Sequence, residues 1–107
     1  MDKIPDEALV IRGGRNLSED IRRGTGTHPS GITGISVECA VDVPLEVLAK
    51  NIPHGQIGRT TVGEIRQLGG DVIRTSGQSP YHATLTGLTP KLICSLLTPT
   101  IPNPKSK

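Results

Sequence analysis

The chain has 107 residues and a formal net charge of +2, with no Phe, no Trp and one Tyr. This length suits a single domain around one aliphatic core. The small charge is far from the basic excess expected of a protein that holds duplex nucleic acid mainly through phosphate contacts, although Arg12 with Arg15 and Arg22 with Arg23 are candidates for a small basic patch. The scarcity of aromatic side chains also argues against a surface that stacks nucleic-acid bases, because Tyr81 and three histidines are the only side chains with a planar ring.

The first third of the chain predicts two strands separated by a short helix and a loop. An apolar run over residues 7–12, closed by two glycines, suits a buried strand. Ser18 followed by acidic residues favours a helix start, and Gly24 ends that helix. Residues 24–34 are rich in Gly, Ser, Thr and Pro and predict a loop. Residues 35–41 then alternate as a half-buried strand.

Two helices are expected in the middle of the chain. Pro44 suits the first turn of one helix, and Pro53 marks its end. Thr61 and Glu64 fit the capping box of the other helix, in which each side chain satisfies a backbone amide of the first turn. Two glycines at 69–70 supply the left-handed stop.

Two strands and a helix follow. Residues 71–75 and 82–88 are strand candidates joined by a turn-rich connection that closes a hairpin. Thr89 places an N-cap before Pro90, and apolar residues then form a stripe that packs inward. We therefore expect a single domain over residues 1–98, with residues 99–107 as an extended tail rich in Pro and Lys.

This order of elements predicts an α+β fold with about four short strands in a mainly antiparallel sheet and helices packed on one face. Cys39 and Cys94 are flanked by apolar residues and are interpreted as buried, reduced thiols. No apolar run of membrane-spanning length and no signal peptide is visible, so we expect a cytoplasmic protein. No spacing predicts a metal site or a cofactor, and the oligomeric state stays open.

The best chemical candidate is the row of polar side chains in the strand after residue 81. Alternation places His82, Thr84 and Thr86 on one face and Ala83 and Leu85 on the other. A histidine on a strand beside a turn suits presentation of a reactive group by a rigid scaffold. A histidine that only makes local hydrogen bonds is the more ordinary interpretation.

If His82 is catalytic, metal-independent cleavage of RNA is the most economical chemistry, because it needs a proton shuttle and a cation for the phosphate. Arg12 or Arg74 would supply the cation, and the threonines would donate hydrogen bonds to phosphate oxygens. A second acid or base would come from the set His28, His54 and Glu38. His28 and Tyr81 are further candidates for contact with a ligand.

Arg12 on the first strand and Ser36 on the second resemble the order in which ADP-ribosyltransferases use an arginine and a serine. That resemblance implies a catalytic glutamate on a late strand, whereas the last carboxylate side chain here is Asp71. Activity of this class is therefore the third hypothesis.

The segments LVIRGGRNL, GQIGRTTVGEIRQLGGDV and SPYHATLTGLTP resemble a group of short bacterial proteins of uncharacterised function. The resemblance implies a compact, self-contained bacterial domain and assigns no catalytic residue. Two classes of function lead the hypotheses: a small toxin-like ribonuclease centred on His82, with RNA as its partner, and a non-catalytic module whose Gly-rich loop or sheet edge binds a protein.

Overall fold

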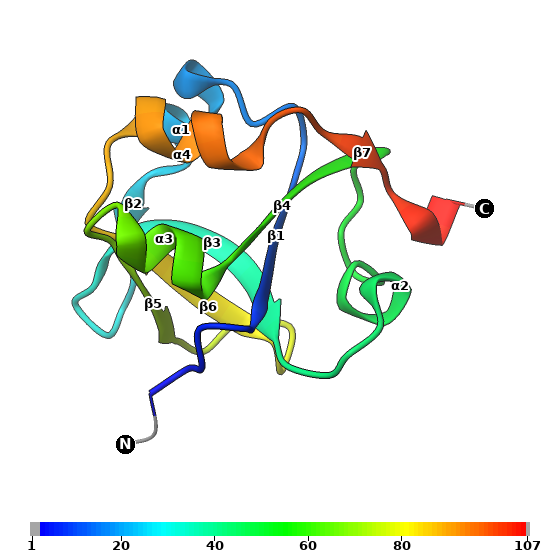
Figure 1. The fold of residues 1–107 in the computed structure, drawn as a ribbon, viewed down its shortest axis with the longest axis horizontal. Helices are drawn as coiled ribbons and strands as arrows, with labels where there is room; N and C mark the ends of the chain where they lie inside the picture. The colour runs from blue at the N-terminus through cyan, green and yellow to red at the C-terminus, as the bar shows by residue number, and fades with distance from the viewer. Residues whose placement is uncertain (1–2, 107) are drawn as a thin grey trace.

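The centre of the structure is an antiparallel sheet in the order β5-β6-β3-β1-β4-β7, with β2 paired to β3 alone (Figure 1). The computed structural model describes residues 3–106. Seven strands are present, rather than the smaller number expected from the sequence. The strands are β1 (Leu9–Gly13), β2 (Gly26–Thr27), β3 (Thr33–Ala40), β4 (Gln56–Thr61), β5 (Asp71–Arg74), β6 (His82–Thr86) and β7 (Ile101–Pro102).

Alternation along β3 and β6 separates a helix-covered face of the sheet from a second, more polar face. Ile35, Val37 and Cys39 of β3 are buried under the helices, together with Ala83 and Leu85 of β6. Helices α1 (Ser18–Gly24), α3 (Val62–Gln67) and α4 (Pro90–Leu97) contribute apolar side chains to this first core. This main part of the fold agrees with the expected α+β architecture.

The expectation that helices pack on one face only is wrong for α2 (Leu45–Leu48). Leu48 joins Ile11 and Ile57 in a second core on the opposite face of the sheet. Ile11 alternates with Val10, so it points away from the first core and needs its own apolar cover. Figure 1 shows α2 at one side of the molecule, apart from the other three helices.

Three strands lie where the sequence predicted loops or an extended tail. β4 carries Gly58 and several polar residues, so its sequence shows little of the alternation typical of a strand. It is a strand because it pairs with β1 from Leu9 to Gly13. β2 and β7 are two residues long and exist because each meets a longer neighbouring strand.

The segment after Thr98 packs on the sheet instead of extending away from it. Ile101 pairs with Ile57 of β4. Asn103 is 1% exposed, and its Nδ2 donates to the carbonyl oxygens of Ile52 (3.3 Å) and His54 (2.9 Å). These bonds hold the segment that precedes β4 in place.

Several local predictions are confirmed. Thr61 Oγ1 accepts a hydrogen bond from the Glu64 amide at 3.2 Å, and Thr89 Oγ1 accepts one from the Leu92 amide at 3.3 Å. β5 and β6 form the expected hairpin. No helix in residues 3–106 combines the length and apolar character needed to cross a membrane.

The two cysteines differ in exposure. Cys39 is fully buried in the first core, whereas Cys94 on α4 is half-buried, and neither forms a disulfide. Burial raises the pKa of the Cys39 thiol, an effect that Arg74 and Arg66 partly offset.

We predict that a chromogenic disulfide reagent at pH 8 modifies Cys94 quickly and Cys39 only when the protein unfolds. The reactive species is the thiolate, and burial disfavours it at Cys39. Cys94→Ser should abolish the fast phase, whereas Cys39→Ser should keep it. Equal rates for the two thiols in the folded protein would contradict this assignment.

Candidate functional site

A cleft lies where the sheet divides. β1 pairs with β3 only over Leu9–Ile11, yet it continues beside β4 as far as Gly13. β3 meanwhile stays paired with β6. The space between the two halves forms a cleft of about 480 Å³, a volume that suits a small-molecule or nucleotide ligand. Its polar side chains come from Arg12, Ser36, Glu38, Asn51, His54, Gln78, Ser79 and His82.

Glu38 and His82 stand directly opposite each other in the β3–β6 ladder. Both alternate away from the first core and line the cleft. Side chains of directly opposed residues in antiparallel strands have Cβ atoms about 4.5–5.5 Å apart. The Oε1 atom of Glu38 is buried and has no hydrogen-bond partner in the described part of the chain. A carboxylate and an imidazole therefore share one wall of the cleft.

A chain of hydrogen bonds orients the His82 ring. Its Nδ1 lies 2.9 Å from Thr75 Oγ1, and that hydroxyl lies 2.9 Å from Thr84 Oγ1. Nδ1 also lies 3.2 Å from the Thr75 carbonyl oxygen. Because a carbonyl oxygen only accepts, this contact assigns the ring proton to Nδ1. Nε2 is then the nitrogen that can exchange protons with a ligand.

Two glycines let the backbone approach these side chains closely. A Cβ on Gly77 would lie 2.5 Å from Cγ of His82, so the β5–β6 connection closes over the ring only because residue 77 is glycine. A Cβ on Gly24 would lie 2.5 Å from Nη2 of Arg12. The sequence marked Gly24 only as the end of a helix, and nothing in the local pattern says which side chain either glycine will meet.

Arg12 brings a positive charge to the cleft without a carboxylate partner. Its Nη1 donates to Asn16 Oδ1 at 2.9 Å, and it forms no ion pair among residues 3–106. Burial lowers the pKa of the Arg12 guanidinium, while the charge of Asp20 opposes that change. A partly desolvated cation that lacks a counter-charge favours binding of an anion.

Asn16 fixes this arginine. It is fully buried at a positive φ of 58°, and its Nδ2 donates to the carbonyl oxygens of Arg12 (3.0 Å) and Gly14 (3.1 Å). Asparagine tolerates this left-handed conformation better than most residues. Sequence reasoning missed this role, since an Asn after two glycines indicates only a turn.

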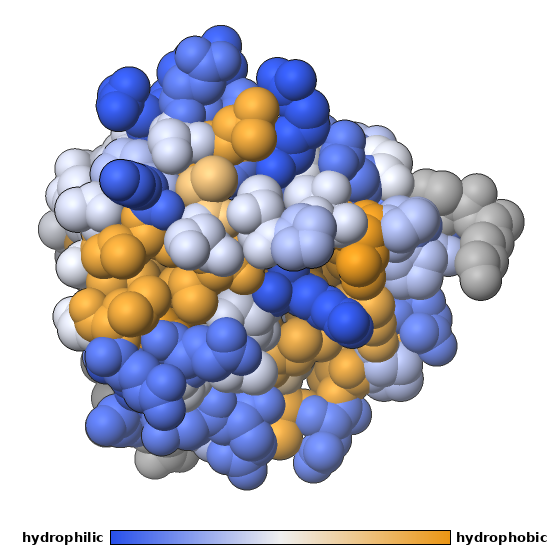
Figure 2. All heavy atoms as spheres, turned by 45° about the horizontal axis from the view of Figure 1, so that its top comes forward, coloured by the Kyte–Doolittle hydropathy of each residue, from blue (hydrophilic) through white to orange (hydrophobic). Residues whose placement is uncertain are grey.

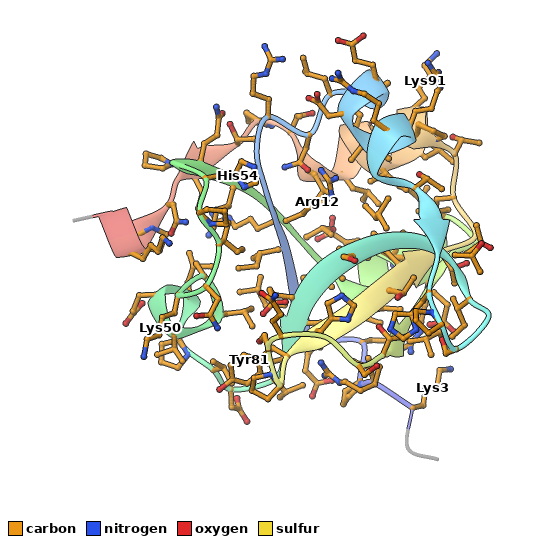
Figure 3. The ribbon with its side chains drawn as sticks, turned by 180° about the vertical axis from the view of Figure 1, so that it is seen from behind. Lys3, Arg12, Lys50, His54, Tyr81 and Lys91 are labelled. Carbon is orange, nitrogen blue, oxygen red and sulfur yellow. The ribbon has the colours of Figure 1, made fainter. Side chains whose placement is uncertain are left out.

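His54 lines the same cleft from the segment before β4. Figure 3 shows Arg12 and His54 near each other at one end of the sheet, whereas Tyr81 lies toward the opposite end. Tyr81 packs against the second core and is not among the residues that line the cleft. It thus lies outside the site, although the sequence suggested a ligand contact.

Three other candidates from the sequence make hydrogen bonds within the fold and do not line the cleft. Arg74 is paired with Ala83 and thus faces away from His82, and its Nη1 donates to the Cys39 carbonyl oxygen at 2.8 Å. Thr86 donates to the Thr33 carbonyl oxygen. Thr84, 3% exposed, supports Thr75 instead of facing the cleft.

His28 lies beside the cleft rather than in it. Its ring centroid is 5.9 Å from that of His82, and its nitrogens lie 2.8 Å from Ser30 Oγ and from the Ser76 carbonyl oxygen. It lines a smaller neighbouring hollow of about 160 Å³ that shares Ser36 with the cleft. The structure therefore brings together Arg12, Glu38, His54 and His82.

Comparisons of the chain with protein-family models, with curated proteins and with solved structures gave no significant match. Within the described residues, no group of three His, Cys, Asp or Glu side chains is placed to hold a metal ion.

We predict that Glu38→Gln does not lower the free energy of unfolding, because the buried Oε1 atom of Glu38 has no hydrogen-bond partner to lose. Chemical denaturation followed by circular dichroism measures the change. Glu46→Gln on the exposed surface of α2 is the matched control and should have little effect. A loss of stability in Glu38→Gln would show that Glu38 has a structural role instead.

Proposed function

We propose that this protein is a ribonuclease that cleaves RNA without a metal ion. The observation that supports the proposal is the arrangement in one cleft of Glu38, its cross-strand partner His82, and the unpaired guanidinium of Arg12. Cleavage by the neighbouring 2′-hydroxyl requires a base, an acid and a positive charge, and these three residues supply that set.

In this proposal, Glu38 accepts the proton of the ribose 2′-hydroxyl as its oxygen attacks phosphorus. The bond from phosphorus to the 5′-oxygen breaks, and Nε2 of protonated His82 gives its proton to that leaving oxygen. The products are a 2′,3′-cyclic phosphate and a free 5′-hydroxyl. Arg12 offsets the negative charge that gathers on the phosphoryl oxygens, in a setting where burial strengthens the interaction.

Neighbouring residues hold the side chains of His82 and Arg12 in place. Thr75 and Thr84 fix the His82 ring, and Asn16 holds Arg12. Such preorganisation lowers the cost of reaching the transition state, because the polar groups need not move when charge develops.

The test is cleavage of a single-stranded RNA of mixed sequence by purified protein in excess chelator. We expect wild type to release products that end in 2′,3′-cyclic phosphate. His82→Ala and Glu38→Gln should each lower kcat/KM by about 10²- to 10⁴-fold, the usual contribution of a general acid or base. Arg12→Gln should also be strongly impaired, whereas Glu46→Gln and Arg22→Gln, changed at exposed positions outside the cleft, should match wild type.

Absence of cleavage by folded wild type would overturn the proposal. Cleavage that survives both His82→Ala and Glu38→Gln would also contradict it, because it would arise from another site or from a contaminant.

A second candidate is transfer or hydrolysis of ADP-ribose from a nicotinamide dinucleotide. It is favoured by one specific observation, namely that Arg12 and Ser36, the two residues of that resemblance, line the same cleft. Against it, Asp71 lies on the edge strand β5 and accepts hydrogen bonds from Arg66 (3.0 Å) and from the Val72 amide (2.8 Å). Among residues 3–106, Glu38 is the only carboxylate that lines the cleft, and it is on the same strand as Ser36.

Release of nicotinamide by wild type separates this candidate from the ribonuclease. If it operates, Ser36→Ala should reduce nicotinamide release at least tenfold, while RNA stays intact. If RNA is cleaved and nicotinamide is not released, the second candidate fails.

The non-catalytic interaction module, which would bind a protein through the Gly-rich loop or a sheet edge, remains a prediction. A separate feature is that Leu68 and Leu92 are 45% and 36% exposed near the ends of α3 and α4. Figure 2 shows apolar side chains gathered on part of the face that it presents. A folded protein that is inactive toward both substrates would favour the interaction module and make capture of a partner protein the next experiment.

A further inference from the structure

A second hollow adjoins the cleft at the end that holds the positive charge. It has a volume of about 370 Å³ and shares Arg12, Gly13 and His54 with the cleft. Its remaining polar side chains are Arg15, Asn16, Asp20 and Gln56. We call it the arginine hollow. Because the two spaces have common walls, a ligand chain that lies in one can continue into the other.

The arginine hollow has a surplus of positive charge. Asp20 is the only carboxylate of the described residues that lines it, and this group accepts hydrogen bonds from Arg23 at 2.8 Å and from the Leu17 amide at 3.2 Å. Arg15 is exposed and forms no ion pair in the described part of the chain. Arg12 in the shared wall and Arg15 beyond it thus lack an ion-pair partner among the described residues, and both are near the single negative charge of Asp20, whose carboxylate is paired with Arg23.

The loop that carries Arg15 is fixed on both sides. Before it, the Gly14 amide donates to the Gln56 carbonyl oxygen at 2.9 Å, and Gly14 adopts a positive φ of 95°. After it, buried Asn16 binds the carbonyl oxygens of Arg12 and Gly14. The backbone position of Arg15 relative to Arg12 is therefore set by the fold, so that only side-chain freedom is lost when a ligand binds.

We propose that the arginine hollow binds the phosphate that flanks the scissile one, so that the substrate is a single RNA strand of at least three nucleotides. This proposal rests on the proposed ribonuclease function. A dinucleotide has one internucleotide phosphate, which Arg12 would hold in the cleft. The next phosphate along the strand reaches Arg15. A duplex does not suit the site, because the overall charge is small and the cleft is the size of a single nucleotide.

The test compares kcat/KM for a dinucleoside monophosphate with kcat/KM for the two trinucleotides that extend it by one nucleotide on either side. For wild type we expect one of the two extensions to raise kcat/KM about tenfold, the effect of one additional charge-assisted contact. In Arg15→Gln that ratio should fall to about one. Arg22→Gln, which removes the same charge from an exposed position outside both spaces, should keep the ratio of wild type.

Salt provides a second readout. For single strands, the slope of the logarithm of affinity against the logarithm of salt concentration changes by about 0.7 for each phosphate contact. Arg15→Gln should reduce this slope for the favoured trinucleotide, and Arg22→Gln should not. Equal ratios in wild type and Arg15→Gln, or equal loss in Arg15→Gln and Arg22→Gln, would overturn the inference while leaving ribonuclease activity established.

A binding experiment distinguishes failure of the hollow from failure of catalysis. A labelled trinucleotide with 2′-O-methyl groups cannot be cleaved, and its binding is followed by fluorescence anisotropy. If RNA is not cleaved but this probe binds wild type about tenfold more tightly than Arg15→Gln, the hollow holds a strand and the proposed reaction is wrong. If the probe does not distinguish the two proteins, the phosphate subsite is wrong.

Discussion

Beyond Ile11, β1 no longer pairs with β3, and the halves of the sheet separate around the cleft. Asn16 lies a few residues past this point, fully buried in the turn that follows β1. Its Nδ2 donates to the carbonyl oxygens of Arg12 and Gly14, and its Oδ1 accepts from the guanidinium of Arg12. One buried side chain therefore both fixes the turn after β1 and orients the cation. The carboxylate and imidazole lie on the other half, where the β3–β6 ladder sets their spacing.

The elements with strong local patterns could be predicted from the sequence. Alternation identified β3 and β6, and Thr61 and Thr89 identified two helix starts, because each of these signals depends on a few adjacent residues. β4, β2 and β7 could not be found in this way, since they are stabilised by partners far away in the chain. The place of α2 on the second face likewise depends on Ile11 and Ile57, which its own sequence does not reveal.

The candidate site was only partly predictable from the sequence, because it too depends on contacts between residues that are far apart in the chain. Period-two alternation correctly grouped His82 with Thr84 on one face, yet only tertiary contacts show that Thr84 supports Thr75. Arg12 and Arg74 looked equivalent as sources of charge. The structure separates them, because Arg74 binds a backbone carbonyl oxygen on the opposite face, and Arg12 enters the cleft. Glu38 was one of several candidate partners, and its register opposite His82 is a property of strand pairing.

Asn103 connects the last part of the described chain to the wall of the cleft, since its amide binds the carbonyl oxygens of Ile52 and His54, both of which line that wall. These contacts join residues about 50 positions apart, and Asn103 comes later in the chain than every residue given above as lining the cleft. The wall that bears His54 is therefore held from a distant part of the chain, whereas the positions of Glu38 and His82 are set by the β3–β6 ladder alone.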